Sequence, residues 1–258
     1  MLAINPFAAL TGSVSPGLMQ GYVALMAVLV AGGTLYDVVH KGSARYFFDN
    51  WRRTKGKAQQ VGGGELASIA VRTAVVDFLA SGEFCNARRR VAHLLTMYGF
   101  IIYVVSTVVL VFGYPNAAAA DPWPQLWWLG ALLVLVGGYW FWFFIRVDVA
   151  AEGASPWRVM RADLFVLSLL ASVTLGVVWA WVQANGGAGA HIWFALYIVA
   201  TTVLFGSVPW SKFAHMFFKP AAAFEKRVAN ANGTRANLPP PAEQPEQFGK
   251  TPKHAHHY

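Results

Sequence analysis

Five apolar runs in the chain are each long enough to cross a lipid bilayer as a helix. They cover residues 18–39, 91–112, 126–145, 164–182 and 192–208. A spanning helix needs about 20 predominantly apolar residues, and prolines or glycines separate most of these runs where the chain must turn. The pattern predicts an all-α integral membrane protein, with a bundle of five transmembrane helices over residues 18–220.

The long polar connection at about residues 40–90 contains one further amphipathic pattern. Its apolar positions at helical spacing are Leu66, Ile69, Val76 and Leu79. These positions predict a helix that either lies in the membrane interface or packs on another subunit. Residues 221–258 are rich in Ala, Pro, Asn and Gln, which predicts a flexible tail.

Composition narrows the class of protein. Of 258 residues, 56% are hydrophobic and only 12% are charged, which fits one polytopic membrane domain and not an ordinary soluble domain. In a soluble protein the net charge of +8 would point to nucleic acid. Here membrane topology explains the cations better, so no nucleic-acid partner is expected.

The cations also predict the orientation of the bundle, because Lys and Arg near helix ends are retained on the cytoplasmic side. Of the twenty, ten lie between Lys41 and Arg90, three between Arg146 and Arg161, and seven from Lys212 onward. The N-terminal segment, residues 1–17, is therefore expected outside, and the C-terminus in the cytoplasm. A belt of tryptophans at the outer interface is expected from Trp123, Trp127, Trp128, Trp179, Trp181 and Trp193.

Two function classes find little support. The single cysteine, Cys85, excludes a disulfide within the chain and an iron–sulfur cluster or CxxC pair held by this chain alone. The intramembrane carboxylates, Asp37 and Asp163, lie at helix ends and mark no ion pathway, so a transporter is disfavoured.

The main chemical candidate is a pair of histidines. Arg88, Arg89 and Arg90 run directly into the second span, with His93 just past them, and His215 lies where the fifth span ends. These two helices are expected to be antiparallel, which places both imidazoles at a similar depth near the inner face. Imidazole is the usual axial ligand of a b-type haem between membrane helices. The alternative is that each histidine only hydrogen-bonds near the interface.

The runs RRRVAHLLTMYGF and PWSKFAHMFFKP resemble the cytochrome b membrane subunits of the nitrate reductase gamma, quinone-interacting oxidoreductase and heterodisulfide reductase type. The resemblance covers about residues 67–220. It implies that His93 and His215 bind one haem b on the cytoplasmic side. If this haem is bound, Arg88, Arg89 and Arg90 are predicted to contact its propionates; a partner contact is the other prediction for them.

The chain departs from that family at the positions of a second, outer haem. Where two-haem members have the outer histidine ligands, this chain has Tyr103 and Tyr197. The resemblance therefore supports at most one haem. The two tyrosines either face each other across the vacated outer site or serve only in core packing.

The reduced histidine set and the five-span layout are most similar to the membrane anchor subunits of dissimilatory adenylylsulfate reductase. That resemblance implies a multi-pass subunit of the bacterial cytoplasmic membrane that links a cytoplasmic iron–sulfur flavoprotein of sulfur metabolism to quinone. The alternatives are a haem-free structural anchor and a nitrate reductase gamma-like cytochrome b subunit. Membrane lipid is a further expected partner.

Overall fold

The computed structural model shows only helices and connecting segments over the residues that it describes. These are residues 2–10, 12–40, 49, 52, 61–82, 84, 86–116, 122–148, 153–210 and 215–233, without the side chains of 162 and 215–218. The chain divides into two compact units, of which the first contains Met1–His40 and Asn86–His215, and the second Lys41–Cys85 and Met216–Tyr258.

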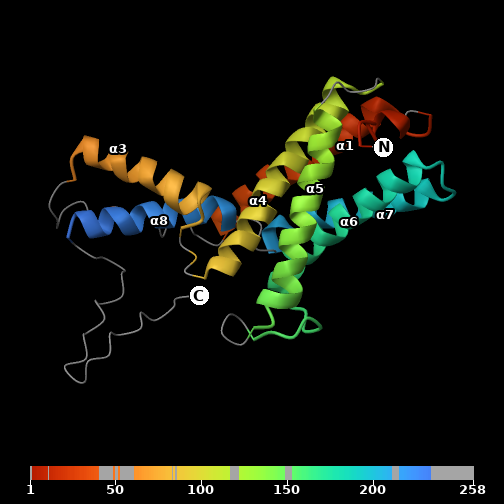
Figure 1. The fold of residues 1–258 in the computed structure, drawn as a ribbon. Coiled ribbons are helices and arrows are strands. Elements are labelled where there is room, and N and C mark those ends of the chain that lie inside the picture. Colours follow the sequence, from red (N-terminus) through yellow and green to blue (C-terminus); the bar gives the residue numbers. More distant parts are fainter. Residues whose placement is uncertain are drawn as a thin grey trace. The chain divides into compact units, whose positions relative to one another are not determined.

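The first unit is a bundle of apolar helices (Figure 1). Its long helices are α1 (Pro16–His40), α4 (Ala87–Val108), α5 (Trp123–Trp140), α6 (Leu164–Ala184) and α7 (Ala190–Gly206). Short 3-10 or π segments extend or flank them: η1 (Ala8–Leu10), η3 (Val109–Gly113), η4 (Phe141–Ile145), η5 (Arg161–Asp163) and η6 (Val208–Trp210).

Four helical stretches are long and apolar enough to cross a membrane, which indicates a multi-pass membrane protein. They are Pro16–His40, Ala87–Gly113, Trp123–Ile145 and Leu164–Ala184, and they coincide with the first four predicted spans. The fifth predicted span is also an apolar helix, Ala190–Gly206, but has only 17 residues. At 1.5 Å per residue it is about 25 Å long. Five spans, and the sides on which the termini lie, therefore remain predictions.

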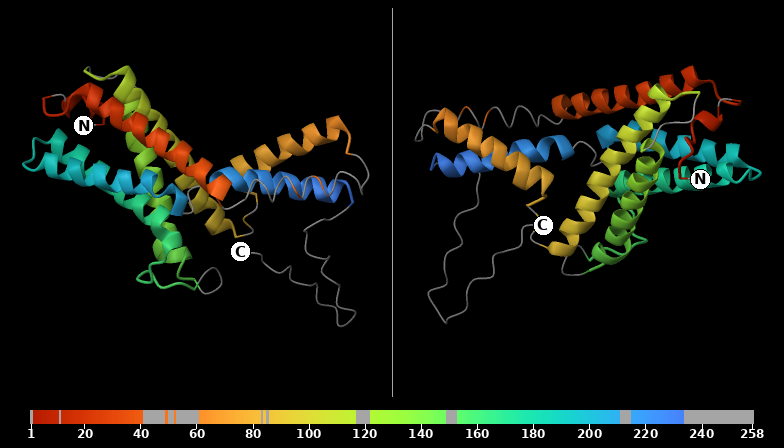
Figure 2. Two further views of the ribbon diagram at one scale, coloured as in Figure 1. Left: turned by 180° about the vertical axis from the view of Figure 1, so that it is seen from behind. Right: turned by 45° about the horizontal axis from the view of Figure 1, so that its top comes forward.

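The bundle is built from two helix pairs. α4 packs along α5, α6 packs along α7, and α1 contacts α7 and η6 (Figure 2). The α4–α5 pair is close because glycines face each other where the helices cross. A Cβ added to Gly130 would lie 2.6 Å from the backbone nitrogen of Tyr103 and 2.9 Å from the carbonyl oxygen of Gly99. Such small-residue contacts bring membrane helices together through backbone packing.

The start of α4 is fixed by a helix cap. The side-chain oxygen of Asn86 accepts hydrogen bonds from the backbone nitrogens of Arg88 (2.9 Å) and Arg89 (3.2 Å). This cap satisfies two of the four free N–H groups at the helix start. Cations in the first turn oppose the helix dipole, so the three arginines do not stabilise α4 itself. Their position there calls for an explanation outside the helix.

In the second unit, α3 (Gly63–Arg72) continues into the π segment η2 (Thr73–Leu79), which confirms the predicted helix in this connection. Its apolar positions do not form one buried stripe, because Leu66 and Ile69 are half-buried whereas Val76 and Leu79 are exposed. The alternatives of a membrane-interface helix and a subunit contact both stay predictions.

The other helix of the second unit is α8 (His215–Ala231), which extends through residues 221–231 of the sequence-assigned tail. It is joined to η2 by Arg227, whose Nε and Nη2 donate to the carboxylate of Asp77 at 2.7 and 2.9 Å. These hydrogen bonds raise the pKa of Arg227 above its ordinary value. The pair gives the Ala-rich helix a tertiary contact that composition does not reveal. The rest of the predicted tail, from residue 234, lies outside the described residues.

Candidate functional site

The two predicted haem ligands lie on different helices, and the structure describes only one of their side chains. His93 is half-buried in the second turn of α4. His215 is the first residue of α8, and its side chain lies outside the described part of the chain. The pairing of the two imidazoles is therefore still a prediction. His191, by contrast, is exposed in the first turn of α7.

The fifth apolar helix ends slightly earlier than the sequence predicted. α7 ends at Gly206, two residues before the predicted end at Val208, and Val208–Trp210 form a separate 3-10 turn. Pro209 lies in this turn, and proline lacks the N–H that would continue the helical ladder. His215 thus belongs to the next helix and not to the end of α7.

The three arginines before His93 differ in exposure. Arg88 is exposed, whereas Arg89 and Arg90 are half-buried. All three stand within the first turn of α4, whose N-terminal dipole adds to their positive charge. This end of the helix is suited to bind an anionic group, such as a carboxylate or a phosphate. Contact with haem propionates or with a partner stays a prediction.

A buried hydroxyl contact in the middle of the bundle joins the two tyrosines at the outer-ligand positions. The hydroxyl of Tyr103 on α4 donates to the hydroxyl of Tyr197 on α7 at 3.3 Å, and both side chains are buried. The two tyrosines face each other, and their burial among aromatic rings also confirms the interpretation as core-packing residues. α4 and α7, which are far apart in the sequence, are therefore in contact at the two positions that the resemblance assigns to the outer haem ligands.

The surroundings of the tyrosine pair leave no room for a haem. The ring of Tyr103 lies 5.0 Å from that of Trp127, and the ring of Tyr197 is stacked on Trp179 at 5.7 Å. On α6, a Cβ added to Gly176 would meet the Tyr103 hydroxyl at 2.8 Å. A porphyrin needs an open slot between its axial ligands, and here aromatic rings and helix backbone fill that space. The outer site does not fit a haem.

Hydrogen bonds continue from Tyr197 toward α6. Thr201 Oγ1 donates to the carbonyl oxygen of Tyr197 at 2.8 Å and forms a hydrogen bond of 2.7 Å with the hydroxyl of Ser172. Both hydroxyl-bearing residues are buried. Such bonds add specific contacts between apolar helices, where burial alone does not distinguish one helix face from another.

A double-mutant cycle tests the tyrosine contact. Tyr103→Phe or Tyr197→Phe leaves the other hydroxyl buried without its partner, and we expect each to cost about 1–3 kcal/mol of unfolding free energy. The double variant removes both polar groups, so we expect it to be less destabilised than the sum of the singles. Unfolding in detergent followed by circular dichroism measures this. Additive costs would show that the hydroxyls do not interact.

A ring contact fixes the direction in which His93 lies on α4. Phe100 of α4 packs against Phe205 near the end of α7, with ring centroids 6.4 Å apart. His93 is seven residues, or two helical turns, before Phe100 and so lies on the same helix face. Tyr103 and Phe100 contact α7 in antiparallel order, at Tyr197 and then Phe205. The face of α4 that carries His93 therefore points toward the C-terminal end of α7.

The sequence missed a buried ion pair between α5 and α6. Arg146 is fully buried, and its Nη2 donates to Asp163 Oδ2 at 2.7 Å. Its two Nη atoms also donate to the carbonyl oxygens of Ser155 (2.8 Å) and Arg158 (2.7 Å), and the guanidinium lies 4.2 Å from the ring of Trp142. In the sequence, Arg146 was interpreted only as one of the cations that predict the orientation in the membrane. It is a structural residue that holds the connection between the two helices.

The expected tryptophan belt is wrong for two of its members. Trp127 and Trp179 are fully buried, and the ring of Phe7 lies 6.1 and 5.4 Å from theirs. Trp181, by contrast, is 54% exposed. In a helix that is apolar all round, sequence does not show which side faces lipid and which faces protein. Trp127 and Trp179 belong to the core.

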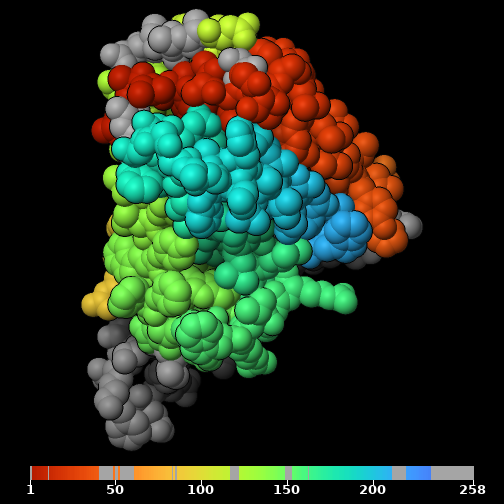
Figure 3. Space-filling view, turned by 90° about the vertical axis from the view of Figure 1, so that its right-hand side faces the viewer, coloured from red at the N-terminus to blue at the C-terminus, as the bar shows by residue number. Residues whose placement is uncertain are grey.

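The N-terminal segment forms part of this core. Buried Asn5 donates to the carbonyl oxygens of Tyr114 (2.9 Å) and Leu110 (3.4 Å), and its own oxygen accepts from the backbone nitrogen of Phe7 (3.0 Å). The amide of Gln183 on α6 donates to the carbonyl of Pro6 at 2.7 Å. In Figure 3 the N-terminal residues, in red, lie beside α6 and α7, in cyan. The segment thus closes one end of the bundle.

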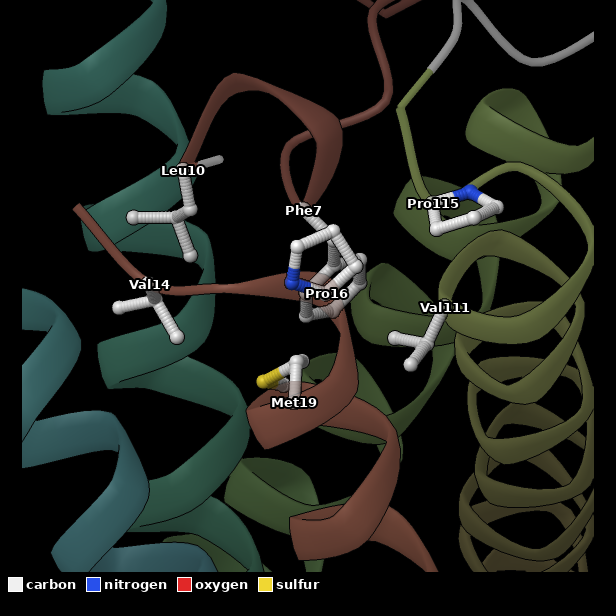
Figure 4. Close-up of a pocket in the computed structure, with 7 residues that line it drawn as sticks. All are labelled: Phe7, Leu10, Val14, Pro16, Met19, Val111 and Pro115. Atoms are coloured by element: carbon white, nitrogen blue, oxygen red, sulfur yellow. The ribbon is translucent and has the colours of Figure 1, made fainter. Parts of the chain in front are cut away.

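A small apolar cavity lies beside the N-terminal segment, at the start of α1 (Figure 4). Its lining residues are Phe7, Leu10, Val14, Pro16, Met19, Val111 and Pro115. Its volume of about 10 Å³ is near the lower limit for one water molecule. It is too small for a quinone ring. Among the described residues, no group of three or more metal-ligating side chains forms a cluster.

Comparisons with known proteins give limited similarity. No family model and no solved structure matches the chain. Citrate utilization protein B of Escherichia coli is 25% identical over 166 residues, which cover 62% of this chain and 42% of that protein. NADH-ubiquinone oxidoreductase chain 6 of Gadus morhua is 37% identical over 101 residues, 34% of this chain and 58% of that protein. The chain thus spans about two fifths and three fifths of the lengths of these relatives.

Proposed function

We propose that this protein is a membrane anchor and electron-transfer subunit. In this proposal it binds a cytoplasmic iron–sulfur flavoprotein of the adenylylsulfate reductase type and passes electrons between that partner and membrane quinone. The observation that carries the proposal is the tyrosine pair. Tyr103 and Tyr197 stand 3.3 Å apart, hydroxyl to hydroxyl, at the two positions that the resemblance assigns to one shared site. The pairing of His93 with His215, the first residue of α8, is the second part of this proposal and rests on the resemblance.

One haem b at the inner end of α4 completes the proposal. His93 and His215 would be its axial ligands, and Arg88, Arg89 and Arg90 would pair with its propionates. The haem, when bound, supplies the one-electron chemistry. The chain holds the ligands in place and sets the polarity around them. The similarity to NADH-ubiquinone oxidoreductase chain 6, whose name places it in a quinone-linked oxidoreductase, supports a role in membrane redox chemistry.

The absorbance spectrum of the purified full chain, produced with ample haem, tests the ligand assignment. We expect a b-type spectrum and at most one haem per chain. His93→Ala and His215→Ala should each abolish it, because a six-coordinate b-type haem needs two axial ligands. His191→Ala is the matched control and should retain the haem, since this histidine is exposed at the start of α7. Absence of b-type absorbance in the unmodified chain would refute the haem.

Partner binding needs a separate experiment. Membranes that contain the full chain are mixed with purified adenylylsulfate reductase, and the bound enzyme is measured after sedimentation. The proposal predicts saturable binding and reduction of membrane quinone when the enzyme is supplied with electrons. Replacing Arg88, Arg89 and Arg90 with Gln should weaken binding if they contact the partner. Saturable binding of a nitrate reductase catalytic subunit, with none of adenylylsulfate reductase, would favour the nitrate reductase gamma-like alternative.

A haem-free structural anchor is the second candidate. It is favoured by the packing around Tyr103 and Tyr197, which fills the outer position with aromatic rings. A bundle that has lost one site completely needs no redox group to hold its helices. This candidate predicts that the double variant His93→Ala/His215→Ala binds the flavoprotein, and passes electrons, as well as the unmodified chain does. A loss of electron flow in that variant, with binding retained, would exclude it.

A further inference from the structure

The connection between α5 and α6 exposes large apolar side chains next to cations. Trp157 is 86% exposed, Val159 62% and Met160 44%. Arg158 and Arg161, which alternate with them, are exposed as well. An indole ring with one apolar and one polar edge is most stable at the boundary between lipid and water. A cluster that interleaves such a ring with guanidinium groups has the chemistry of a headgroup-binding surface.

These side chains are displayed by a backbone that is held in place. Arg146 donates to the carbonyl oxygens of Ser155 and Arg158, one on each side of Trp157. The backbone nitrogen of Arg158 donates to the carbonyl oxygen of Ser155 at 3.0 Å, and this hydrogen bond closes a turn that contains residue Trp157. On the far side, the Asp163 carboxylate accepts from the backbone nitrogen of Met160 at 2.9 Å. Exposure of Trp157 is therefore a property of a defined loop conformation.

The position of the loop along the chain places it at the end of the membrane-spanning part. η4 ends at Ile145, and α6 begins at Leu164, directly after Asp163. Both flanking stretches are long and apolar enough to cross a membrane. Large apolar side chains are exposed at the end of the α5 stretch as well, where Phe143 is 45% and Phe144 71% exposed. A loop that joins the ends of two membrane-spanning stretches lies at the headgroup layer.

We propose that residues 157–161 form a lipid-binding patch at the membrane interface. The side chains of Trp157, Val159 and Met160 lie among the headgroups and upper acyl chains. The guanidinium groups of Arg158 and Arg161 bind the phosphates of anionic phospholipids, since the guanidinium fork matches phosphate oxygens. Trp, Met and Arg are also frequent in protein interfaces, but the position of the loop between two spanning stretches favours lipid. This patch does not depend on the proposed haem.

Site-directed fluorescence in lipid nanodiscs tests the patch. In the full chain, Cys85→Ser removes the native thiol and Val159→Cys carries an environment-sensitive dye. Quenching is measured with aqueous iodide and with a lipid spin-labelled near its headgroup. In phosphatidylcholine we expect partial quenching by the lipid and weaker quenching by iodide. Mixing in phosphatidylglycerol should raise the lipid quenching several-fold.

Variants test the cationic and the apolar side chains of the patch separately. Arg158→Gln/Arg161→Gln should remove the increase caused by phosphatidylglycerol, and Trp157→Ala should lower lipid quenching in both membranes. A dye on Ala188→Cys, in the uncharged turn between α6 and α7, is the control and should show no such increase. Iodide quenching of the Val159→Cys dye equal to that of free dye would overturn the proposal. Protection from iodide only after a soluble partner is added would instead identify a protein-docking surface.

Discussion

Arg146→Gln is expected to destabilise the protein by about 3–5 kcal/mol, because it removes one partner of a buried ion pair. Arg146 is fully buried, and the Asp163 side chain is only 12% exposed. The substitution also removes the donors to the carbonyl oxygens of Ser155 and Arg158. Several polar groups then lose their partners at once, and each such loss costs more than an exposed hydrogen bond. Chemical or thermal unfolding in detergent measures the change.

Two further variants show which property of Arg146 matters. Arg146→Lys keeps the charge but not the planar fork, so it cannot bond both carbonyls and the carboxylate in the same geometry. We expect an intermediate loss. Arg158→Gln is the matched control, since its guanidinium is exposed and only its carbonyl accepts from Arg146. A change within about 0.5 kcal/mol is expected there. Equal stability of Arg146→Gln and Arg158→Gln would contradict the buried clamp.

The helices were predictable from sequence because the length of an apolar run sets the length of a spanning helix. The predicted runs at residues 91–112 and 164–182 correspond to the helical stretches Ala87–Gly113 and Leu164–Ala184. Their ends shifted for local reasons that a hydropathy pattern does not contain, such as the Asn86 cap before α4. The predicted end of the last run, Val208, was wrong, because α7 stops at Gly206 and Pro209 follows in a separate turn.

Part of the candidate site was also predictable. Facing hydroxyls and core packing were the two interpretations of Tyr103 and Tyr197, and the structure shows both, since the hydroxyls are in contact and the rings are buried. The role of Arg146 was not predictable, because counting cations treats every arginine as exposed to water or headgroups. The burial of Trp127 and Trp179 in the core was not predictable for a related reason. When a helix is apolar on all sides, its sequence pattern carries little information about which side packs on a neighbour.

The close contact of α4 and α5 gives the second large expected effect. A Cβ on Gly130 would lie 2.6 Å from the nitrogen and 2.9 Å from the Cα of Tyr103, and real Cβ atoms essentially never come within 3.0 Å of such atoms. The obstacle is helix backbone, which cannot rotate away as a side chain would. We therefore expect Gly130→Ala to force the helices apart and to cost about 1–3 kcal/mol or more.

Gly32→Ala is the matched control, because it adds the same methyl group to a helix but meets nothing within 4 Å. Since alanine favours a helix over glycine by about 0.5–1 kcal/mol, this variant should be neutral or more stable. Opposite signs for the two substitutions, measured by unfolding in the same detergent, would establish that α4 and α5 pack through backbone contact. Because Tyr103 directly contacts Gly130, the same displacement should also weaken the Tyr103–Tyr197 coupling. Retention of both stability and coupling in Gly130→Ala would show that the helices do not cross at this glycine.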